Sequence, residues 1–374
     1  MSKLTKKSVD DANAFPKPYL LWDGELRGFG LLVLPSGVKT YVFQYRNEAR
    51  RSRRLTIGRH RPLTVGQARE IVREAAVAVA KGNDPVVAVV RRADVRADLQ
   101  QRDLAGGFLA SGFIDEQVNG GGALLNAKPS VENVKTIAQS HWCFGTTGLL
   151  PTLTTDTPEI MCAAINAVRE ARFGNSAILG IHIEGPFLDV VRKGVHAALF
   201  IRSITEEEIN NLAAADRSFR CQFCPSTGRV ECWSHCVYPF VQRDEPDHRT
   251  RARYGGRCPC RSDRFMLITD AMSSAAGGPQ RFELQGRKVK VTERKLQLDD
   301  GTLAGSNLTV DKVVRYAVHT LCVDFAKALR MASFNPARYL KLDHELGRIA
   351  PGYRASLVHL DQNLKVLETW VDGT

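Results

Sequence analysis

The sequence predicts an α/β fold, a (β/α)8 barrel of the TIM type that is incomplete and carries a small β-sandwich, preceded by a small α+β domain. Three observations predict the barrel and the small first domain, whereas the sandwich and the incompleteness of the barrel follow from motifs given below. A chain of 374 residues with 44% hydrophobic residues is too long for one small domain. Residues 19–59 alternate apolar and polar positions like antiparallel strands. Beyond residue 104, strand-like runs alternate with helical segments, which is typical of a parallel sheet.

The formal net charge of +12 is concentrated in two stretches. Residues 1–100 carry 19 Lys and Arg against 10 Asp and Glu, and residues 217–264 carry 10 against 5. A confined basic surplus is typical of a module that meets a polyanion, although a well-solvated basic face has the same composition. No apolar run approaches the roughly 18 residues of a membrane span, and the first residues lack the apolar core of a secretion signal. We therefore expect a cytoplasmic protein that makes no contact with membranes.

The first domain is predicted to be a three-stranded antiparallel meander with one helix. Its apolar alternation is broken by turn residues at 35–37 and 47–48. Thr64 followed by Gln67 is a helix start signal, and helical periodicity then continues to Gly82. This helix should cover one face of the sheet.

Several motifs stand in order within residues 3–86: LTKKSVD, LWDGELRGFGLLV, KTYVFQYR, RRLTIGR and LTVGQAR. Together they resemble the arm-type DNA-binding domain of phage integrases. The resemblance implies docking on duplex DNA through phosphates or base edges, although any single arginine would equally solvate an edge strand. Nothing after residue 90 resembles an integrase catalytic domain, so we expect DNA binding without recombination. The arginines implied to contact DNA are Arg46, Arg51, Arg53, Arg54, Arg59 and Arg61.

Four strand-like runs in the second part of the chain end in polar residues: 112–115, 145–152, 178–184 and 265–270. The first is followed by a tight glycine-rich loop at 119–122. In a (β/α)8 barrel the functional groups gather at the carboxyl ends of the strands. These runs therefore predict a site at that end of the barrel.

Two carboxylates, Glu184 and Asp270, end two of the predicted strands. In metal-assisted amide hydrolysis, a carboxylate and imidazoles hold a divalent ion that activates water, and a second carboxylate carries the water's proton to the leaving amine. Glu184 fits the ligand role and Asp270 the acid–base role. Taken singly, each residue is more simply explained as a cap or a salt-bridge partner.

Further motifs follow in order: GFIDEQVNGGG, GTTGLLPTLTTDTPE, GIHIEGPFL, RKGVHAALFIR, LITDAMSSAAGG, DGTLAGSNLT, LRMASFNPARYLKLD, LGRIAPGYRASLVHLD and TWVDGT. They resemble the N-acetylglucosamine-6-phosphate deacetylases of the amidohydrolase superfamily over about 91–216 and 261–374. The resemblance implies hydrolysis of N-acetyl-D-glucosamine 6-phosphate to D-glucosamine 6-phosphate and acetate in amino-sugar metabolism. It also implies one divalent metal ion per subunit, namely zinc, and a homodimer.

The same resemblance assigns roles to individual residues. Glu184 is implied as a metal ligand and Asp270 as the general base and acid. His196 would by itself be read as a surface histidine, but its motif implies ligand contact. The last two motifs look like strands of the small β-sandwich. The residues implied to contact the sugar phosphate are Val195 and His196, together with Leu303, Ala304 and Gly305 in a loop.

The resemblance stops between Asp216 and Arg261, where the family's two metal-binding histidines are missing. Read one base later, codons for 238–244 can spell Thr-His-Leu-Phe-Asn-Ala-Met, and codons for 217–221 can spell Gly-His-Ser-Asp-Ala. These are strings in which the family places its histidines. We infer a frameshift across 217–260, with family segments lost on both sides of it, and therefore predict impaired activity.

Six of the nine cysteines crowd into the same stretch. A structural zinc site is the competing interpretation, because thiolates and imidazoles at short spacing bind zinc. The spacings are CxxC, CxxxC and CxC, which form no consistent framework. The cysteines are Cys221, Cys224, Cys232, Cys236, Cys258 and Cys260, with His235 among them.

Three hypotheses for function follow: a deacetylase, an integrase-derived DNA-binding module on a non-catalytic barrel remnant, and a gene remnant that does neither. The predicted segments are 1–86 for the DNA-binding-like domain, 87–103 for a linker and sandwich remnant, 104–216 for the first half of the barrel, 217–260 for the frameshifted segment, 261–345 for the last part of the barrel and 346–374 for the C-terminal sandwich strands.

Overall fold

The computed structural model divides the chain into two compact units, Met1–Ala88 and Val89–Thr374. The structure describes residues 3–46, 52–80, 102–188, 190–206, 208, 220–223, 236–237, 265–291 and 295–373.

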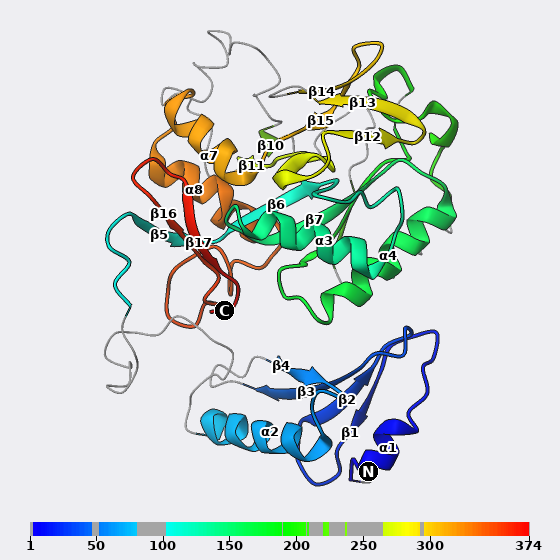
Figure 1. The fold of residues 1–374 in the computed structure, drawn as a ribbon, viewed down its shortest axis with the longest axis vertical. Coiled ribbons are helices and arrows are strands. Elements are labelled where there is room, and N and C mark those ends of the chain that lie inside the picture. Colours follow the sequence, from blue (N-terminus) through cyan, green and yellow to red (C-terminus); the bar gives the residue numbers. More distant parts are fainter. Residues whose placement is uncertain are drawn as a thin grey trace. The chain divides into compact units, whose positions relative to one another are not determined.

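The first unit contains a four-stranded antiparallel sheet, one strand more than the sequence predicts (Figure 1). The additional strand arises because Asp23 splits the first apolar run: its carboxylate accepts the N–H groups of Glu25 and Leu26 at 2.9 and 2.8 Å. Gly28, with a φ of +82°, completes the turn, and a Cβ there would lie 2.1 Å from the Gln44 carbonyl oxygen. The strands are β1 (Tyr19–Trp22), β2 (Phe29–Val33), β3 (Lys39–Arg46) and β4 (Ser52–Arg59), in that order.

Two helices accompany this sheet, α1 (Lys6–Asp10) and α2 (Val65–Ala80). The predicted start of α2 is confirmed by a capping box, in which the Thr64 N–H donates to Gln67 Oε1 at 2.9 Å and the Gln67 N–H donates to Thr64 Oγ1 at 3.3 Å. Apolar residues of α2 share one buried cluster with residues of β2 and β3, so the helix covers one face of the sheet as expected. The predicted helix end at Gly82 lies outside the described residues.

The second unit is built on parallel strands. A four-stranded sheet contains β6 (Phe113–Val118), β7 (Thr146–Thr154), β8 (Gly180–Glu184) and β9 (Arg220–Phe223), with α3 (Val131–Trp142) and α4 (Pro158–Arg172) between the first three strands. β10 (Cys236–Val237) pairs in parallel with β11 (Met266–Leu267).

The four predicted barrel strands are therefore confirmed as β6, β7, β8 and β11. A parallel bridge between Val118 and Ala271 sets the end of the β11 segment beside the end of β6. The strands within the described ranges form no closed barrel. This arrangement nevertheless gathers the carboxyl ends of β6, β8 and β11 at one place, which is where the predicted site residues stand.

Two antiparallel sheets complete the second unit. In the first of them, β16 (Leu357–Leu360) pairs with β5 (Phe108–Ser111) on one side and with β17 (Val366–Trp370) on the other. The other sheet holds β12 (Arg281–Leu284), β13 (Arg287–Val291), β14 (Lys295–Leu298) and β15 (Leu303–Ser306). Helices α7 (Val310–His319), α8 (Phe325–Ala332) and α9 (Phe334–Tyr339) follow it, and single 3-10 turns lie at Val190–Arg192, Ala198–Phe200 and Ala275–Gly277.

The predicted loop at 303–305 is instead part of strand β15. Its ends pair with β14, Leu303 with Gln297 and Ser306 with Lys295. The strand forms because the preceding turn at 299–302 returns the chain antiparallel to β14, and the Thr302 carbonyl accepts the Leu298 N–H at 2.9 Å.

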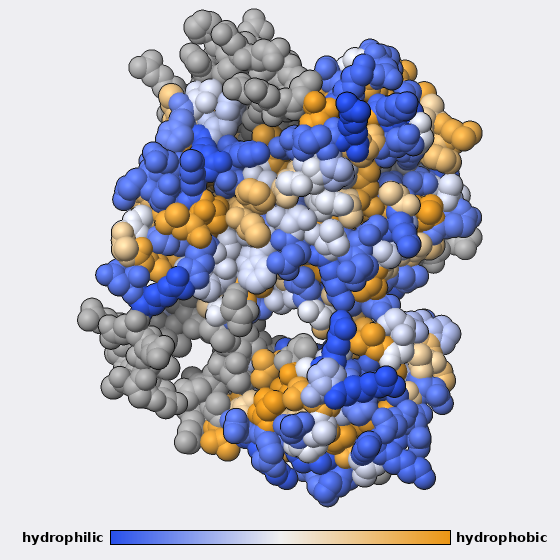
Figure 2. Space-filling model, viewed as in Figure 1, coloured by the Kyte–Doolittle hydropathy of each residue, from blue (hydrophilic) through white to orange (hydrophobic). Residues whose placement is uncertain are grey.

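Hydrophilic residues cover most of the visible face of each unit, with hydrophobic residues between them (Figure 2). Within the described ranges, no helix combines the length and apolar character that a bilayer crossing requires.

Candidate functional site

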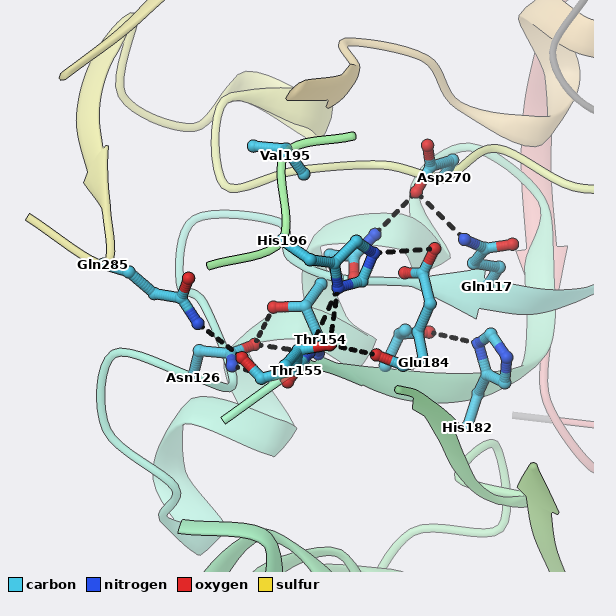
Figure 3. A network of polar contacts seen from close by, with 12 residues as sticks. Gln117, Asn126, Thr154, Thr155, His182, Glu184, Val195, His196, Asp270 and Gln285 are labelled. Atoms are coloured by element: carbon cyan, nitrogen blue, oxygen red, sulfur yellow. Dashed lines mark hydrogen bonds and ion pairs between the residues drawn. The ribbon is translucent and has the colours of Figure 1, made fainter. Parts of the chain in front are cut away.

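Glu184 ends β8 and starts a sharp turn (Figure 3). The next residue, Gly185, has a φ of +91°, and a Cβ there would lie 2.1 Å from Thr155 Oγ1. Glycine is therefore required for β7 and β8 to approach this closely at their ends. The Glu184 side chain is 16% exposed, so its carboxylate lies in a largely dry place.

His196 faces this carboxylate from the segment that follows β8. Its Nε2 lies 3.7 Å from Glu184 Oε1, and its Nδ1 lies 2.8 Å from Thr155 Oγ1. Burial alone would raise the pKa of Glu184, but the neighbouring His196, together with the charge of His182 and the Gln117 amide, outweighs it and lowers the pKa. Glu184 is therefore held as a carboxylate.

Asp270 lies just beyond β11 with a φ of +53°, a conformation uncommon for a non-glycine residue. Its Oδ1 accepts hydrogen bonds from Asn119 Nδ2 at 2.7 Å and Gln117 Nε2 at 3.2 Å. Burial and the nearby negative charge of Glu184 raise the pKa of Asp270 well above its usual range, and the two amide donors offset only part of this. Asp270 therefore keeps its proton to a higher pH than an ordinary aspartate.

Asp115, on β6, supports the residues around Asp270. Its Oδ2 accepts from Thr269 Oγ1 at 2.6 Å, and its Oδ1 accepts from the Gln117 N–H at 3.2 Å. Burial raises the pKa of Asp115 to about 7. Asp115 is thus a second carboxyl that can hold a proton, and it bonds to Thr269, the residue before Asp270.

The sequence prediction missed Gln117, Asn119 and Thr155. The first two were detectable, because Asp115, Gln117 and Asn119 alternate along β6 and the residue after it, and alternate residues of a strand face the same side. That periodicity places all three side chains on one face of the strand. Asp270 contacts Gln117 and Asn119 on that face. Thr155 had no comparable signal, because its role depends on the approach of Gly185.

The residues implied to contact the sugar phosphate lie in two segments. Val195 is half-buried against the apolar cluster of the β12–β15 sheet, which includes Ala304. Gly305 has a φ of +88°, and a Cβ there would lie 3.1 Å from the Asp270 carbonyl oxygen. The Ser306 N–H donates to that carbonyl at 3.0 Å. Leu303, Ala304 and Gly305 thus run beside Asp270.

The donor groups of the described residues do not by themselves make a metal site. Among the described residues, no three His, Cys, Asp or Glu side chains converge as a metal site needs. Glu184 supplies one carboxylate, and the nearest imidazole, His196, uses Nδ1 on Thr155. The six clustered cysteines, for which a zinc site is the competing interpretation, lie outside the residues whose side chains are described.

Three of the arginines implied to contact DNA lie on one face of the first unit's sheet. Arg46, Arg54 and Arg59 are exposed, and Arg54 donates to Gln44 Oε1 at 3.2 Å. Strand register pairs Gln44 with Arg54 and Thr40 with Arg59, and residues 40, 44 and 46 alternate with the core residues of β3. These three arginines therefore lie on the sheet face away from α2. Arg61 is exposed in the following turn, while Arg51 and the side chain of Arg53 lie outside the described part of the chain.

Comparisons with known proteins distinguish the two units. Residues 4–92 match the Arm DNA-binding domain family, and residues 257–374 match the Amidohydrolase family. The chain is 31% identical over 340 residues to N-acetylgalactosamine-6-phosphate deacetylase of Shewanella sp. (strain ANA-3), covering 75% of this chain and 86% of the relative. It is 25% identical over 365 residues to N-acetylglucosamine-6-phosphate deacetylase of Haemophilus influenzae, covering 81% and 95%.

Solved structures agree with this similarity. The crystal structure of N-acetylglucosamine-6-phosphate deacetylase from Pasteurella multocida superposes with a TM-score of 0.66 at 25% identity, over 75% of this chain and 90% of that one. The alignment to the Shewanella relative is 340 positions long, but it covers only 75% of the 374 residues of this chain, which is fewer than 340 residues. Some aligned positions are therefore gaps in this chain. The relative therefore has residues without a counterpart here.

Proposed function

The chain belongs to the amidohydrolase family, among the deacetylases of N-acetylated hexosamine 6-phosphates, and we propose that its substrate is N-acetylglucosamine 6-phosphate. The products would be D-glucosamine 6-phosphate and acetate. The convergence of Glu184, His196 and Asp270 at the ends of β8 and β11 carries this proposal. Each of the three stands in a motif that resembles those of the deacetylases, and their side chains meet in a buried, polar place.

In the proposed reaction, water adds to the acetyl carbonyl and the C–N bond breaks. Asp270 accepts the water's proton and returns it to the leaving amine. Its carboxyl is oriented for this by Gln117 and Asn119. His196 and Val195, with the strand at 303–305, are proposed to hold the phosphorylated sugar.

We propose that this activity is impaired. Deacetylases of this family are metal-dependent, the proposed ion being zinc, and Glu184 is the one described residue that we assign as a ligand. A single carboxylate holds a catalytic ion poorly. The pKa of Asp270, raised by burial and by the charge of Glu184, also makes it a poorer acceptor of the water's proton. The proposed cause is the frameshift across 217–260, which removes both histidines.

The test is acetate release by the purified chain from N-acetylglucosamine 6-phosphate with added zinc. We expect no more release than from the Asp270→Asn variant. A chain in which 217–260 and the lost flanking segments are replaced by the corresponding stretch of the Shewanella relative should release acetate, and Asp270→Asn should lower that rate about 10²- to 10⁴-fold. The epimeric galactosamine substrate is assayed in parallel, because relatives of both names are similar to the chain.

Two outcomes would contradict the proposal. Asp270-dependent acetate release by the unaltered chain would show that activity is not impaired. A folded replacement chain that prefers the galactosamine compound would show that the proposed sugar is wrong while the reaction stands.

A second function is favoured by the match of residues 4–92 to the Arm DNA-binding domain family. We propose that the first unit binds duplex DNA through Arg46, Arg54 and Arg59 on one sheet face, with Arg51, Arg53 and Arg61 nearby in sequence. Guanidinium groups on one face match phosphates spaced along a groove. This function needs no intact barrel, so it is independent of the deacetylase proposal.

A further inference from the structure

We propose that the tip of the β12–β13 hairpin is a positioning element of the sugar-phosphate site, in which Gln285 and Arg287 hold the two segments that orient His196. The inference rests on the proposed role of His196 in substrate contact. It extends that role to two residues that lie outside the deacetylase motifs.

The hairpin tip makes one hydrogen bond to each segment. Gln285 Nε2 donates to the Thr155 carbonyl oxygen at 2.5 Å, and Arg287 Nη2 donates to the Val195 carbonyl oxygen. Thr155 follows β7, and Val195 precedes His196. Two residues of one short turn therefore join segments that are 40 positions apart in the chain.

Both segments act on the same imidazole. Thr155 contacts His196 Nδ1 twice, through Oγ1 at 2.8 Å and through its N–H at 3.4 Å. With Nδ1 engaged, Nε2 faces Glu184 at 3.7 Å. Figure 3 shows Gln285 and Asp270 on opposite sides of His196. A shift of Thr155 or Val195 would therefore turn the ring away from the carboxylates.

The geometry of the turn supports this role. Leu284 pairs with Arg287 across a two-residue turn in which Gln285 has a φ of +51° and Gly286 a φ of +76°. Such turns favour Asn, Asp or Gly at the first position, so glutamine there is strained. Strained residues cluster at functional sites. The longer side chain of glutamine is what reaches Thr155.

The hairpin is also held to the same segment by apolar contacts. Leu284, directly before the turn, and Val289 are buried in one cluster, and Val195 packs against it. These contacts help to keep the turn in a fixed position beside Val195. Gln285 and Arg287 are half-buried, whereas Lys288 on the same hairpin is exposed. Lys288 thus offers a matched control.

The test follows the His196 ring in the full chain labelled with ¹⁵N-histidine, and the His196→Gln variant assigns its signal among the nine histidines. Thr155→Val removes the direct hydroxyl partner and calibrates the shift of the ring nitrogens. We expect Gln285→Leu and Arg287→Met to move the His196 signals in the same direction by a smaller amount. Arg287→Lys should restore part of the change, and Lys288→Met should leave the signals in place.

Binding of N-acetylglucosamine 6-phosphate by calorimetry is the second readout. Gln285→Leu and Arg287→Met should each weaken it about tenfold, because a small displacement of a positioning group has a large effect. Unchanged His196 signals in both variants, with a clear shift in Thr155→Val, would overturn the inference. If the unaltered chain binds no sugar phosphate, the proposed substrate is wrong, and the ring signals still decide the role of the hairpin.

Discussion

Each unit of this protein contains a buried aspartate, but the pKa of the first is lowered and the pKa of the second is raised. In the first unit, Asp23 is fully buried as a side chain and its Oδ2 lies 2.6 Å from Arg69 Nη2. Burial alone would raise the pKa of Asp23, but Arg69 and the N–H groups of three residues lower it. In the second unit, the described neighbours of the Asp270 carboxyl are amide donors and a carboxylate, and its pKa is raised.

The difference separates a structural carboxylate, Asp23, from Asp270, which we propose to be the reactive one. Asp23 also accepts the Leu4 N–H at 2.9 Å, while Arg69 donates to the Leu4 carbonyl, so the ion pair fastens the N-terminal segment to the sheet. All its bonding capacity is used within the fold. Among the described residues no cation pairs with Asp270, and a strongly shifted pKa is typical of groups at functional sites, which agrees with the acid–base role proposed for it.

The largest effect is expected from breaking the buried ion pair. Arg69→Met leaves Asp23 charged and unpaired in the core, which should destabilise the first unit by about 3–5 kcal/mol. Hydrogen–deuterium exchange of the α2 and β3 peptides in the full chain measures this unit by itself. Peptides of β6 and β7 should keep their wild-type exchange.

The matched control is Arg73→Met, one turn along α2. Arg73 pairs with Glu70 at 2.5 Å, but both side chains are more than half exposed. Its loss should change exchange very little, since exposed pairs contribute less than about 1 kcal/mol. Equal effects of the two variants would contradict the assignment of Asp23 as a structural carboxylate.

Acidity should act in opposite directions on the stability that Asp23 and Asp115 contribute to their units. The pKa of Asp23 is lowered, so its stabilisation is present above its unfolded pKa near 4 and is lost as the pH falls through its folded pKa. The pKa of Asp115 is raised to about 7. Between its unfolded value and about 7, Asp115 keeps its proton in the folded state and loses it in the unfolded chain, so its contribution to stability decreases as the pH rises.

For Asp115 this loss is at most about 4 kcal/mol across the window, because its pKa rises from 3.8 to about 7 and each step of one in pKa corresponds to about 1.4 kcal/mol. Exchange corrected for its intrinsic pH dependence, at several pH values from about 4 to 7.5, measures it. Asp115→Asn should flatten the dependence in β6 and β7 and leave α2 unchanged. A pH dependence in β6 and β7 that is the same in the Asp115→Asn variant as in the unaltered chain would contradict the raised pKa of Asp115.

Much of the fold could be predicted from the sequence where the signal is local. The capping box at Thr64 and the apolar runs of β6, β7, β8 and β11 depend on neighbouring residues, and all were confirmed. The split of the first strand was missed because it depends on the side chain of Asp23 bonding to its own backbone turn. The strand at 303–305 was missed because its partner, β14, lies across a turn.

The candidate site was predicted only in its motif residues. Glu184, His196 and Asp270 stand in recognisable strings, and the structure brings them together. Gln285 stands in no motif, because its contribution is one hydrogen bond to a carbonyl 130 positions away. Contacts to backbone carbonyls leave little trace in sequence, since every residue carries a carbonyl.

The smallest effect is expected from removing exposed arginines, because each contributes only one charge to the proposed DNA contact. This comparison of the two units concerns exposed rather than buried groups. If the first unit binds duplex DNA, Arg54→Met and Arg46→Met should each reduce the slope of log affinity against log salt by about 1, because each removes one phosphate contact. The fold should persist, since both side chains are exposed. Arg281→Met, an exposed arginine of the second unit, should leave the slope unchanged. Binding of the full chain is measured by fluorescence anisotropy over a salt series. An equal reduction by Arg281→Met would assign the DNA contact to charge spread over both units, and no affinity at low salt would exclude DNA as the partner of the first.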